Sequence, residues 1–115
     1  SIKIMSEIKK LTEEINEFRD ARNWRQYHNP KDLALSLTLE AAEILEHFQW
    51  KDGEKLETYL KDNKEDVEDE IADVFIYMLQ LCEELDVDLI AASRDKMKKN
   101  AIKYPVKGAA GWTEK

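Results

Sequence analysis

Apolar side chains recur at helical spacing in two long parts of the chain. Steps of three and four residues place such side chains on one face of an α-helix. In the first part they are Ile4, Ile8, Leu11, Ile15 and Phe18. In the second part they are Val67, Ile71, Val74, Met78, Leu81 and Leu85. The pattern predicts one amphipathic helix that ends near residue 22 and another over about residues 64–85.

The segment between these helices predicts a further helix that is apolar nearly all round. Asn29 and Pro30 are typical of its start, because Asn can accept from free backbone amides and Pro suits the first helical position. The pattern continues to about Trp50, and Asp52-Gly53 is expected to close the helix. A helix of this kind is buried on several sides, which predicts oligomerisation because one small chain cannot cover it completely.

The remaining segments are shorter or more polar. Residues 23–29 break the helical pattern and predict a connection rich in aromatic and polar groups. Residues 54–62, with Leu56 and Leu60 four apart, predict one or two helical turns or a loop. Asp86 or Asp88 is expected to cap a last helix that ends before Pro105. A loose tail is expected over about residues 105–115.

The composition agrees with an all-α protein. A chain of 115 residues argues for a single domain over residues 1–115. The sequence is 37% charged and has 3 Gly and 2 Pro, which disfavours collagen, low-complexity disorder and many-turned β-sandwiches. We therefore expect a four-helix bundle-like protomer that associates through its helices.

The cysteine content and the apolar runs bear on the location. The single cysteine, Cys82, excludes an intrachain disulfide and a CxxC-type zinc or redox site. The sequence has no apolar run of about 18 residues and no secretory signal pattern. These features predict a cytoplasmic protein without a membrane partner.

Two pairs of acidic residues interrupt the apolar helices. Glu40 and Glu43 are three residues apart in one helix, and Glu70 and Asp73 have the same spacing in another. The side chains of each pair therefore start about 5–6 Å apart on one face. Burying unpaired carboxylates is costly, and His47 is the only basic candidate nearby. Hard divalent cations prefer oxygen ligands, and Mg²⁺ also shares its coordination with substrate phosphates. The pattern predicts a metal site at these four acids.

Acidic residues in such helices have two other interpretations. Acids at a helix start usually serve solubility and the helix dipole, which suits Glu65, Asp66, Glu68 and Asp69. A di-iron bundle needs two Glu-x-x-His pairs, whereas the predicted helices contain one histidine, His47, four residues after Glu43. His47 itself is either a partner of Glu43 or a surface residue.

The net charge of −7 bears on the class of partner. A protein that binds duplex DNA needs a clustered basic face, so nucleic acid is disfavoured. Clustered carboxylates instead recruit the divalent cations that accompany a nucleoside triphosphate. Near the end of the chain, Lys96, Asn100 and Lys103 share one helix face. This strip suits phosphate, or alternatively is a solvated face with cations near the helix C-terminus.

Aromatic residues near the predicted helix ends are candidates for a nucleobase pocket. Trp24 and Trp50 can stack on a base, and the imidazole of His28 can hydrogen-bond a base edge or a phosphate. Ordinary packing at helix ends is the alternative. Tyr77 lies one turn after Asp73, so its hydroxyl is a candidate contact to sugar or phosphate.

The spacing Glu40-x-x-Glu43 followed by Glu70-x-x-Asp73 resembles the MazG-like all-α nucleoside triphosphate pyrophosphohydrolases. Further segments, from about Glu17 to Pro105, resemble the dCTP pyrophosphatase branch of that family in the same order. They are Arg22-Asn23-Trp24, His28-Asn29-Pro30, Phe48-Gln49-Trp50-Lys51, Asp73-Val74-Phe75-Ile76-Tyr77, Lys96-Met97 and Tyr104-Pro105. The match is weak over residues 54–63.

The resemblance implies a house-cleaning enzyme of the nucleotide pool. It implies that a dCTP-like triphosphate is hydrolysed between its α and β phosphates, with Mg²⁺ or, as a substitute, Mn²⁺. The four acids would be the catalytic residues and metal ligands. Lys96 and Asn100 would face phosphates or sugar, and Tyr104 would join the substrate-binding residues. The resemblance also implies homodimers, often paired into homotetramers, with sites near subunit contacts.

Two functions of other classes remain open at this point. A non-enzymatic helical interaction module explains the amphipathic stripes but not the acids embedded in them. A nucleotide sensor with a degenerate site is disfavoured by the intact set of acids.

Overall fold

The computed structural model describes residues 2–106, with side chains from Glu7 onward. Its helices are α1 (Ile2–Ala21), the short 3₁₀ helix η1 (Arg25–Tyr27), α2 (Pro30–Phe48), α3 (Gly53–Asp62), α4 (Lys64–Leu85) and α5 (Leu89–Lys103). The described residues contain no strand. The prediction of an all-α fold is confirmed.

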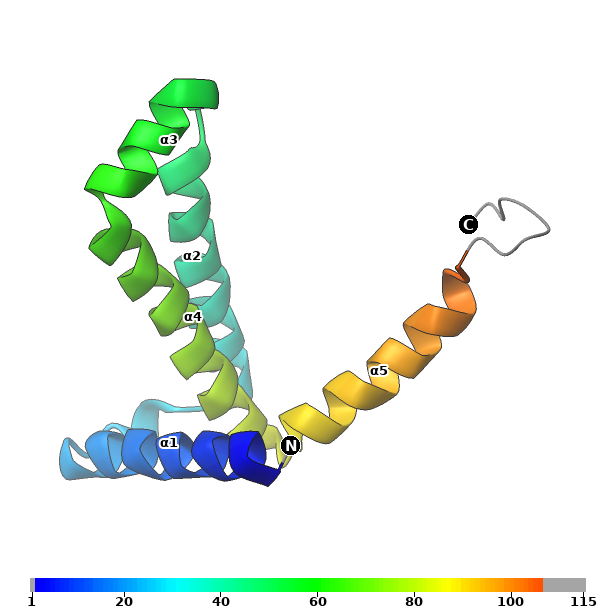
Figure 1. Ribbon diagram of the computed structural model, residues 1–115. Helices are drawn as coiled ribbons and strands as arrows, with labels where there is room; N and C mark the ends of the chain where they lie inside the picture. Colours follow the sequence, from blue (N-terminus) through cyan, green and yellow to red (C-terminus); the bar gives the residue numbers. More distant parts are fainter. Residues whose placement is uncertain (1, 107–115) are drawn as a thin grey trace.

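The centre of the fold is a pair of antiparallel helices, α2 and α4, which lie side by side (Figure 1). Short α3 links the end of α2 to the start of α4. At the opposite end α1 crosses α4, and α5 projects away from this body (Figure 1). The middle parts of α2 and α4 therefore face each other over several turns.

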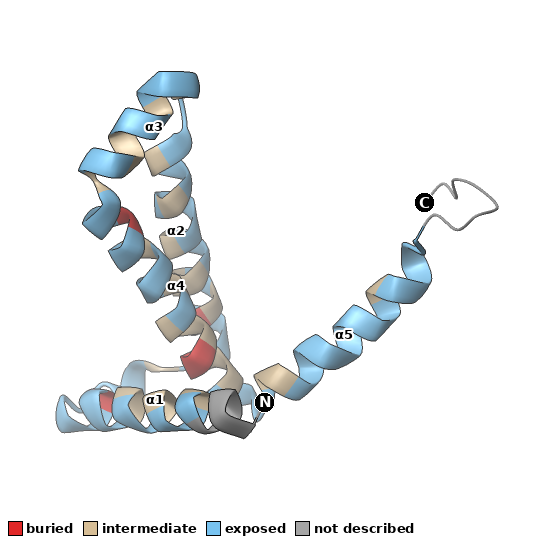
Figure 2. Ribbon diagram, in the orientation of Figure 1, coloured by how far each residue is buried: buried red, intermediate tan, exposed pale blue. Residues whose placement is uncertain are grey.

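The protomer is extended and leaves much apolar surface uncovered. Its radius of gyration is 18.4 Å, whereas a compact domain of this length has about 13 Å. Among the described side chains, three apolar ones are buried: Leu33, Val67 and Leu79 (Figure 2). On α2, the residues Leu35, Leu39 and Leu45 are 57%, 57% and 58% exposed. Helix α2 thus has apolar residues on more sides than this protomer covers.

Most helix boundaries follow local sequence signals. Asn29 precedes α2, and its Oδ1 accepts a hydrogen bond from the backbone N–H of Asp32 at 2.9 Å. Helix α4 covers Lys64–Leu85, as the apolar stripe predicts, and Asp86 ends it with a left-handed φ of 54°. Of the two candidate caps for α5, Asp88 is the one that accepts from the N–H of Ala91, at 3.0 Å.

The corner after α2 differs from the prediction. Helix α2 ends at Phe48, close to the predicted end at about Trp50, but Gly53 begins α3 instead of closing α2. Residues 54–62 form most of a ten-residue helix rather than a loop or a turn or two. A helix of this length is only marginally stable in water on its own. Tyr59 and Leu60 are half-buried in the folded protein, and their packing stabilises the helix.

Two further expectations concern the ends and the surface of the chain. The predicted loose tail falls mostly on residues 107–115, which include Trp112 and lie outside the described residues. None of the described helices combines the length and the apolar content that a membrane span requires.

The cap at Asn29 gives a first test of the fold. Replacing Asn29 by Ala removes the acceptor for the Asp32 amide, so we expect the free energy of unfolding to fall by about 1 kcal/mol. Asn29→Ser retains an acceptor and should lose much less. Urea unfolding followed by circular dichroism measures both, and equal stability of the Ala variant and the parent would contradict this role.

Candidate functional site

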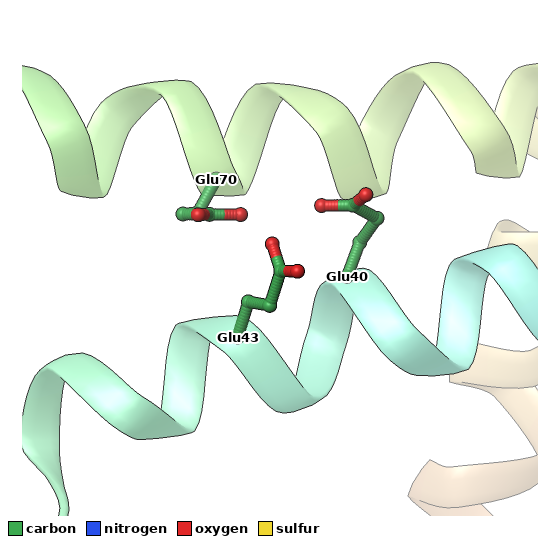
Figure 3. Close-up of side chains that lie close together, drawn as sticks. All are labelled: Glu40, Glu43 and Glu70. Carbon is green, nitrogen blue, oxygen red and sulfur yellow. The ribbon is translucent and has the colours of Figure 1, made fainter.

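The pairing of α2 with α4 brings three carboxylates together. Glu40 and Glu43 project from successive turns of α2, and Glu70 faces them from α4 (Figure 3). One carboxylate oxygen from each residue lies within 4.8 Å of the others. The three-residue spacing within α2 and the antiparallel packing of the two helices together produce this cluster.

Glu70 carries the largest electrostatic perturbation in the cluster. Its Oε2 atom is buried and has no hydrogen-bond partner. A hydrogen bond with the Glu43 carboxyl, reinforced by burial and by the negative charges of Glu43 and Glu40, raises the pKa of Glu70 to about 7. Such a carboxyl–carboxyl hydrogen bond needs a proton, so Glu70 tends to hold one when no cation is present.

Glu40 shares this environment. Burial is the main cause that raises the pKa of Glu40, followed by its hydrogen bond with Glu43 and by the charges of Glu43 and Asp73. A hydrogen bond with Glu70 acts in the opposite direction. Glu40 and Glu70 are half-buried, whereas Glu43 is exposed. The cluster is therefore open on one side to solvent and to solutes.

These residues suit a divalent cation. Among the described residues, the ion pairs join Arg19 to Asp20 and Lys98 to Asp95, so no lysine or arginine neutralises the three glutamates. Hard cations prefer carboxylate oxygens, and the unpartnered Oε2 of Glu70 offers one. The cluster can thus hold a metal ion of the Mg²⁺ or Mn²⁺ class.

Asp73 lies beside the cluster rather than within it. It follows Glu70 by one turn of α4 and is exposed, and its charge raises the pKa of Glu40. The structure brings together three of the four predicted ligands and leaves the fourth as a neighbour. Tyr77, one turn further along α4, is half-buried.

Trp24 and His28 lie in the connection between α1 and α2. The Trp24 ring packs edge-on against Phe18, with centroids 5.7 Å apart, and 46% of the residue remains exposed. His28 is half-buried, and its Nδ1 atom is buried without a hydrogen-bond partner. Burial, helped by the charge of Arg19, lowers the pKa of His28 against the opposing effect of Glu84. A neutral imidazole with a buried, unpartnered Nδ1 results.

Arg19 was not singled out by its position in the sequence. It is 2% exposed at the end of α1, and its Nε atom donates to Asp20 at 2.9 Å. Its backbone carbonyl accepts from the N–H groups of Arg22 and Trp24, at 3.2 and 3.0 Å. Arg19 therefore anchors the start of the connection that carries Trp24. The sequence signal for its burial is its position next to Phe18, at the end of the first apolar stripe.

The residues predicted near the C-terminus stand on a different part of the protomer. Lys96 and Asn100 belong to α5, which projects away from α2 and α4 (Figure 1). Lys96 is exposed and Asn100 is half-buried. Tyr104, which follows α5, is 45% exposed, with the Lys103 ammonium 5.3 Å from its ring centroid. Within one protomer these three residues are not assembled with the carboxylates.

Comparisons with known proteins identify the family of this chain. The family model described as MazG-like matches residues 35–115, which contain all four predicted acids. The chain belongs to the MazG-like family.

Relatives of this MazG-like chain include two mammalian proteins named dCTP pyrophosphatase 1. The one from Bos taurus is 36% identical over 92 residues, and the one from Homo sapiens is 38% identical over 91 residues. These alignments cover 78% and 77% of this chain but 54% of each relative. The chain therefore spans about half the length of the curated relatives it matches.

A solved structure is also similar to this MazG-like chain. It is a pyrophosphatase from Archaeoglobus fulgidus, 46% identical in sequence, with a TM-score of 0.81. The similarity covers 87% of this chain and 94% of that chain. The arrangement of helices that forms the carboxylate cluster is thus shared with a protein of similar length.

The raised pKa of Glu70 predicts how the metal-free protein responds to pH. Below the ordinary value of 4.5 the carboxyl is protonated in both folded and unfolded chains. Between that value and about 7 the folded chain binds more protons, so this group makes the free energy of unfolding fall as pH rises.

Chemical unfolding in EDTA at several pH values measures this effect. We expect the stability of the parent relative to Glu70→Gln to decrease from pH 4.5 to pH 7, because Gln does not titrate. A difference that stays constant over this window would contradict the perturbed pKa.

Proposed function

We propose that this MazG-like protein is a Mg²⁺-dependent pyrophosphohydrolase of nucleoside triphosphates, with dCTP-like substrates preferred. The observation that carries the proposal is the meeting of Glu40, Glu43 and Glu70 across α2 and α4, with a buried Glu70 oxygen that lacks a partner. The names of the relatives, dCTP pyrophosphatase 1 and a pyrophosphatase, support the reaction class.

In this proposal Glu40, Glu43, Glu70 and Asp73 hold the metal ion. When bound, the ion would supply Lewis-acid chemistry: it would favour deprotonation of the attacking water and offset the charge of the phosphates. The carboxylates orient the attacking water, and one of them accepts its proton. Attack on phosphorus breaks the α–β anhydride bond, so that a nucleoside monophosphate and pyrophosphate leave.

The substrate-binding residues divide into two groups. Trp24, His28 and Trp50 stand on connections at the ends of α1 and α2, and they suit the nucleobase. Trp50 is 89% exposed, so its ring is available for stacking. His28, whose pKa is lowered mainly by burial, is the proposed contact to a base edge or a phosphate. Tyr77, on α4 beyond Asp73, suits sugar or phosphate.

The second group of substrate-binding residues can reach the carboxylates only in an assembly of several copies of the chain. Lys96, Asn100 and Tyr104 stand on or after the projecting α5, while no lysine or arginine of the described part of the chain forms an ion pair with Glu40, Glu43 or Glu70. We propose a homodimer or homotetramer in which α5 of one copy contributes these residues to the carboxylates of another. The exposed apolar side chains of α2 supply surface for such an association.

Nucleotides rather than nucleic acids are the proposed partners. The net charge of −7 disfavours a duplex held by side-chain cations alone, whereas a nucleotide arrives with its own divalent cation. A cytoplasmic location, where nucleotides are interconverted, stays a prediction.

Hydrolysis assays test the proposed reaction. With Mg²⁺ and a panel of dCTP, dUTP, dTTP, ATP and modified pyrimidine triphosphates, the protein should release pyrophosphate, fastest from the dCTP-like members. Glu43→Gln and Asp73→Asn each remove a proposed ligand, so we expect activity to fall on the order of 100-fold or more. Glu46→Gln, an exposed glutamate three residues beyond Glu43, is the matched control and should keep full activity. Full activity in both ligand variants would refute the assignment.

A thermal-shift titration separates this enzyme from a non-enzymatic helical module. Mg²⁺ or Mn²⁺ that binds only the folded chain stabilises it by about 2.7 kcal/mol at 100 times its Kd. We expect the unfolding temperature to rise with metal concentration in the parent and in Glu46→Gln, but not in Glu43→Gln. Absence of any metal effect in the parent would favour the interaction module.

Light scattering at micromolar concentration tests the assembly. We expect a dimer or tetramer, because the exposed leucines of α2 otherwise remain in water. Leu39→Glu places a charge on this surface and should shift the mass toward the monomer. Lys61→Glu, on the exposed side of α3, is expected to leave the mass unchanged. A monomeric parent would contradict the assembly.

A further inference from the structure

The corner between α2 and α3 presents Trp50 in an unusual backbone conformation. Its φ angle is +69°, in the left-handed region that bulky residues rarely adopt. On one side the N–H of Gln49 donates to the Leu45 carbonyl at 2.8 Å, and on the other the N–H of Lys51 donates to the Phe48 carbonyl at 3.1 Å. Such a conformation persists when the surrounding structure holds it in place.

Tyr59 is well placed to hold this corner from α3. Its hydroxyl lies 2.7 Å from Nδ1 of His47, in the last turn of α2, and the two rings are 5.8 Å apart. Both residues are half-buried, so water competes less with this hydrogen bond than it would at the surface. The bond joins two helices across twelve residues of sequence.

The residue next to Trp50 contacts the same tyrosine. The ammonium of Lys51 lies 4.2 Å from the centroid of the Tyr59 ring, within cation–π range. The hydroxyl and the ring of Tyr59 thus contact the chain on both sides of Trp50, at His47 and at Lys51. Trp50 itself remains 89% exposed.

Tyr59 also connects this corner to α4. Its backbone carbonyl accepts hydrogen bonds from the backbone N–H and the side-chain Nδ2 of Asn63, each at 2.9 Å. Asn63 in turn accepts from the N–H of Val67, a buried residue of α4. One residue therefore links the end of α2, the Trp50 corner and the start of the helix that carries Glu70.

We propose that Tyr59 is a positioning residue: through His47 and Lys51 it fixes the Trp50 corner and so sets the affinity of the site for the nucleobase. The proposal rests on the proposed function in taking Trp50 as the surface on which the base stacks. Tyr59 touches neither substrate nor metal in this role, and the reaction step itself does not depend on it.

Tyr59→Phe isolates the hydroxyl, because the ring that faces Lys51 stays. Losing one hydrogen bond of ordinary strength corresponds to about a 2- to 10-fold effect. We expect KM for dCTP to rise by that factor while kcat changes less than about twofold. In a cycle with His47→Leu, the double variant should be no worse than either single variant, because both remove the same bond. Additive effects of the two substitutions would overturn the proposal.

A spectroscopic measurement reports on the corner without any turnover. In protein labelled with 5-fluorotryptophan, the ¹⁹F resonance of Trp50 is assigned through Trp50→Phe. We expect this resonance to shift or broaden in Tyr59→Phe, while that of Trp24, on the connection after α1, stays in place. Thr58→Val removes an exposed hydroxyl from the neighbouring position of α3 and is the matched control, with KM and the resonances of Trp24 and Trp50 unchanged.

The two measurements separate the possible failures. An unchanged Trp50 resonance in Tyr59→Phe overturns the positioning role, whatever the activity. A changed resonance with unchanged KM overturns the link to base binding. If the parent releases no pyrophosphate from any nucleotide, the proposed function fails, whereas a Trp50 resonance that depends on Tyr59 still supports the control of this corner by Tyr59.

Discussion

The packing of α2 against α4 fixes the distance across which Glu40 and Glu43 meet Glu70. Apolar burial drives this packing, and each fully buried leucine, such as Leu33 or Leu79, contributes about 1.5–3 kcal/mol. The same packing buries the cluster and brings its carboxyls together: burial is the main cause that raises the pKa of Glu40, and the hydrogen bond with Glu43 is the main cause that raises the pKa of Glu70, with the neighbouring negative charges adding to both. Repulsion between the carboxylates acts against this arrangement, and helix packing maintains it. A bound proton or cation reduces the repulsion.

The parts of this arrangement that depend on a single helix could be predicted from the sequence. The stripe from Val67 to Leu85 gave both ends of α4, and Asn29-Pro30 gave the start of α2. Spacing also placed Glu40 with Glu43 on one face, and Glu70 with Asp73 on another. Of these acids, Glu40, Glu43 and Glu70 meet in the structure. These inferences succeed because helical periodicity is a local property of the chain.

The parts that depend on how helices meet could not be predicted in the same way. Periodicity does not give the crossing of two helices, so the displacement of Asp73 from the other three acids was not visible. Nothing in residues 86–88 reveals that α5 would project from the body. The left-handed Trp50 and the bond between Tyr59 and His47 arise where three segments meet. Sequence alone offered only a weak helical pattern there, at Leu56 and Leu60.

The acids and the proposed base contacts occupy different kinds of structure. Glu40, Glu43, Glu70 and Asp73 stand in the middle of long helices, whereas Trp24, His28 and Trp50 stand on the connections that follow α1 and α2. Connections tolerate substitutions and insertions far better than paired helices do. Substrate preference in such a fold can therefore diverge during evolution by changes in two short segments, while the helices that carry the proposed metal ligands stay the same.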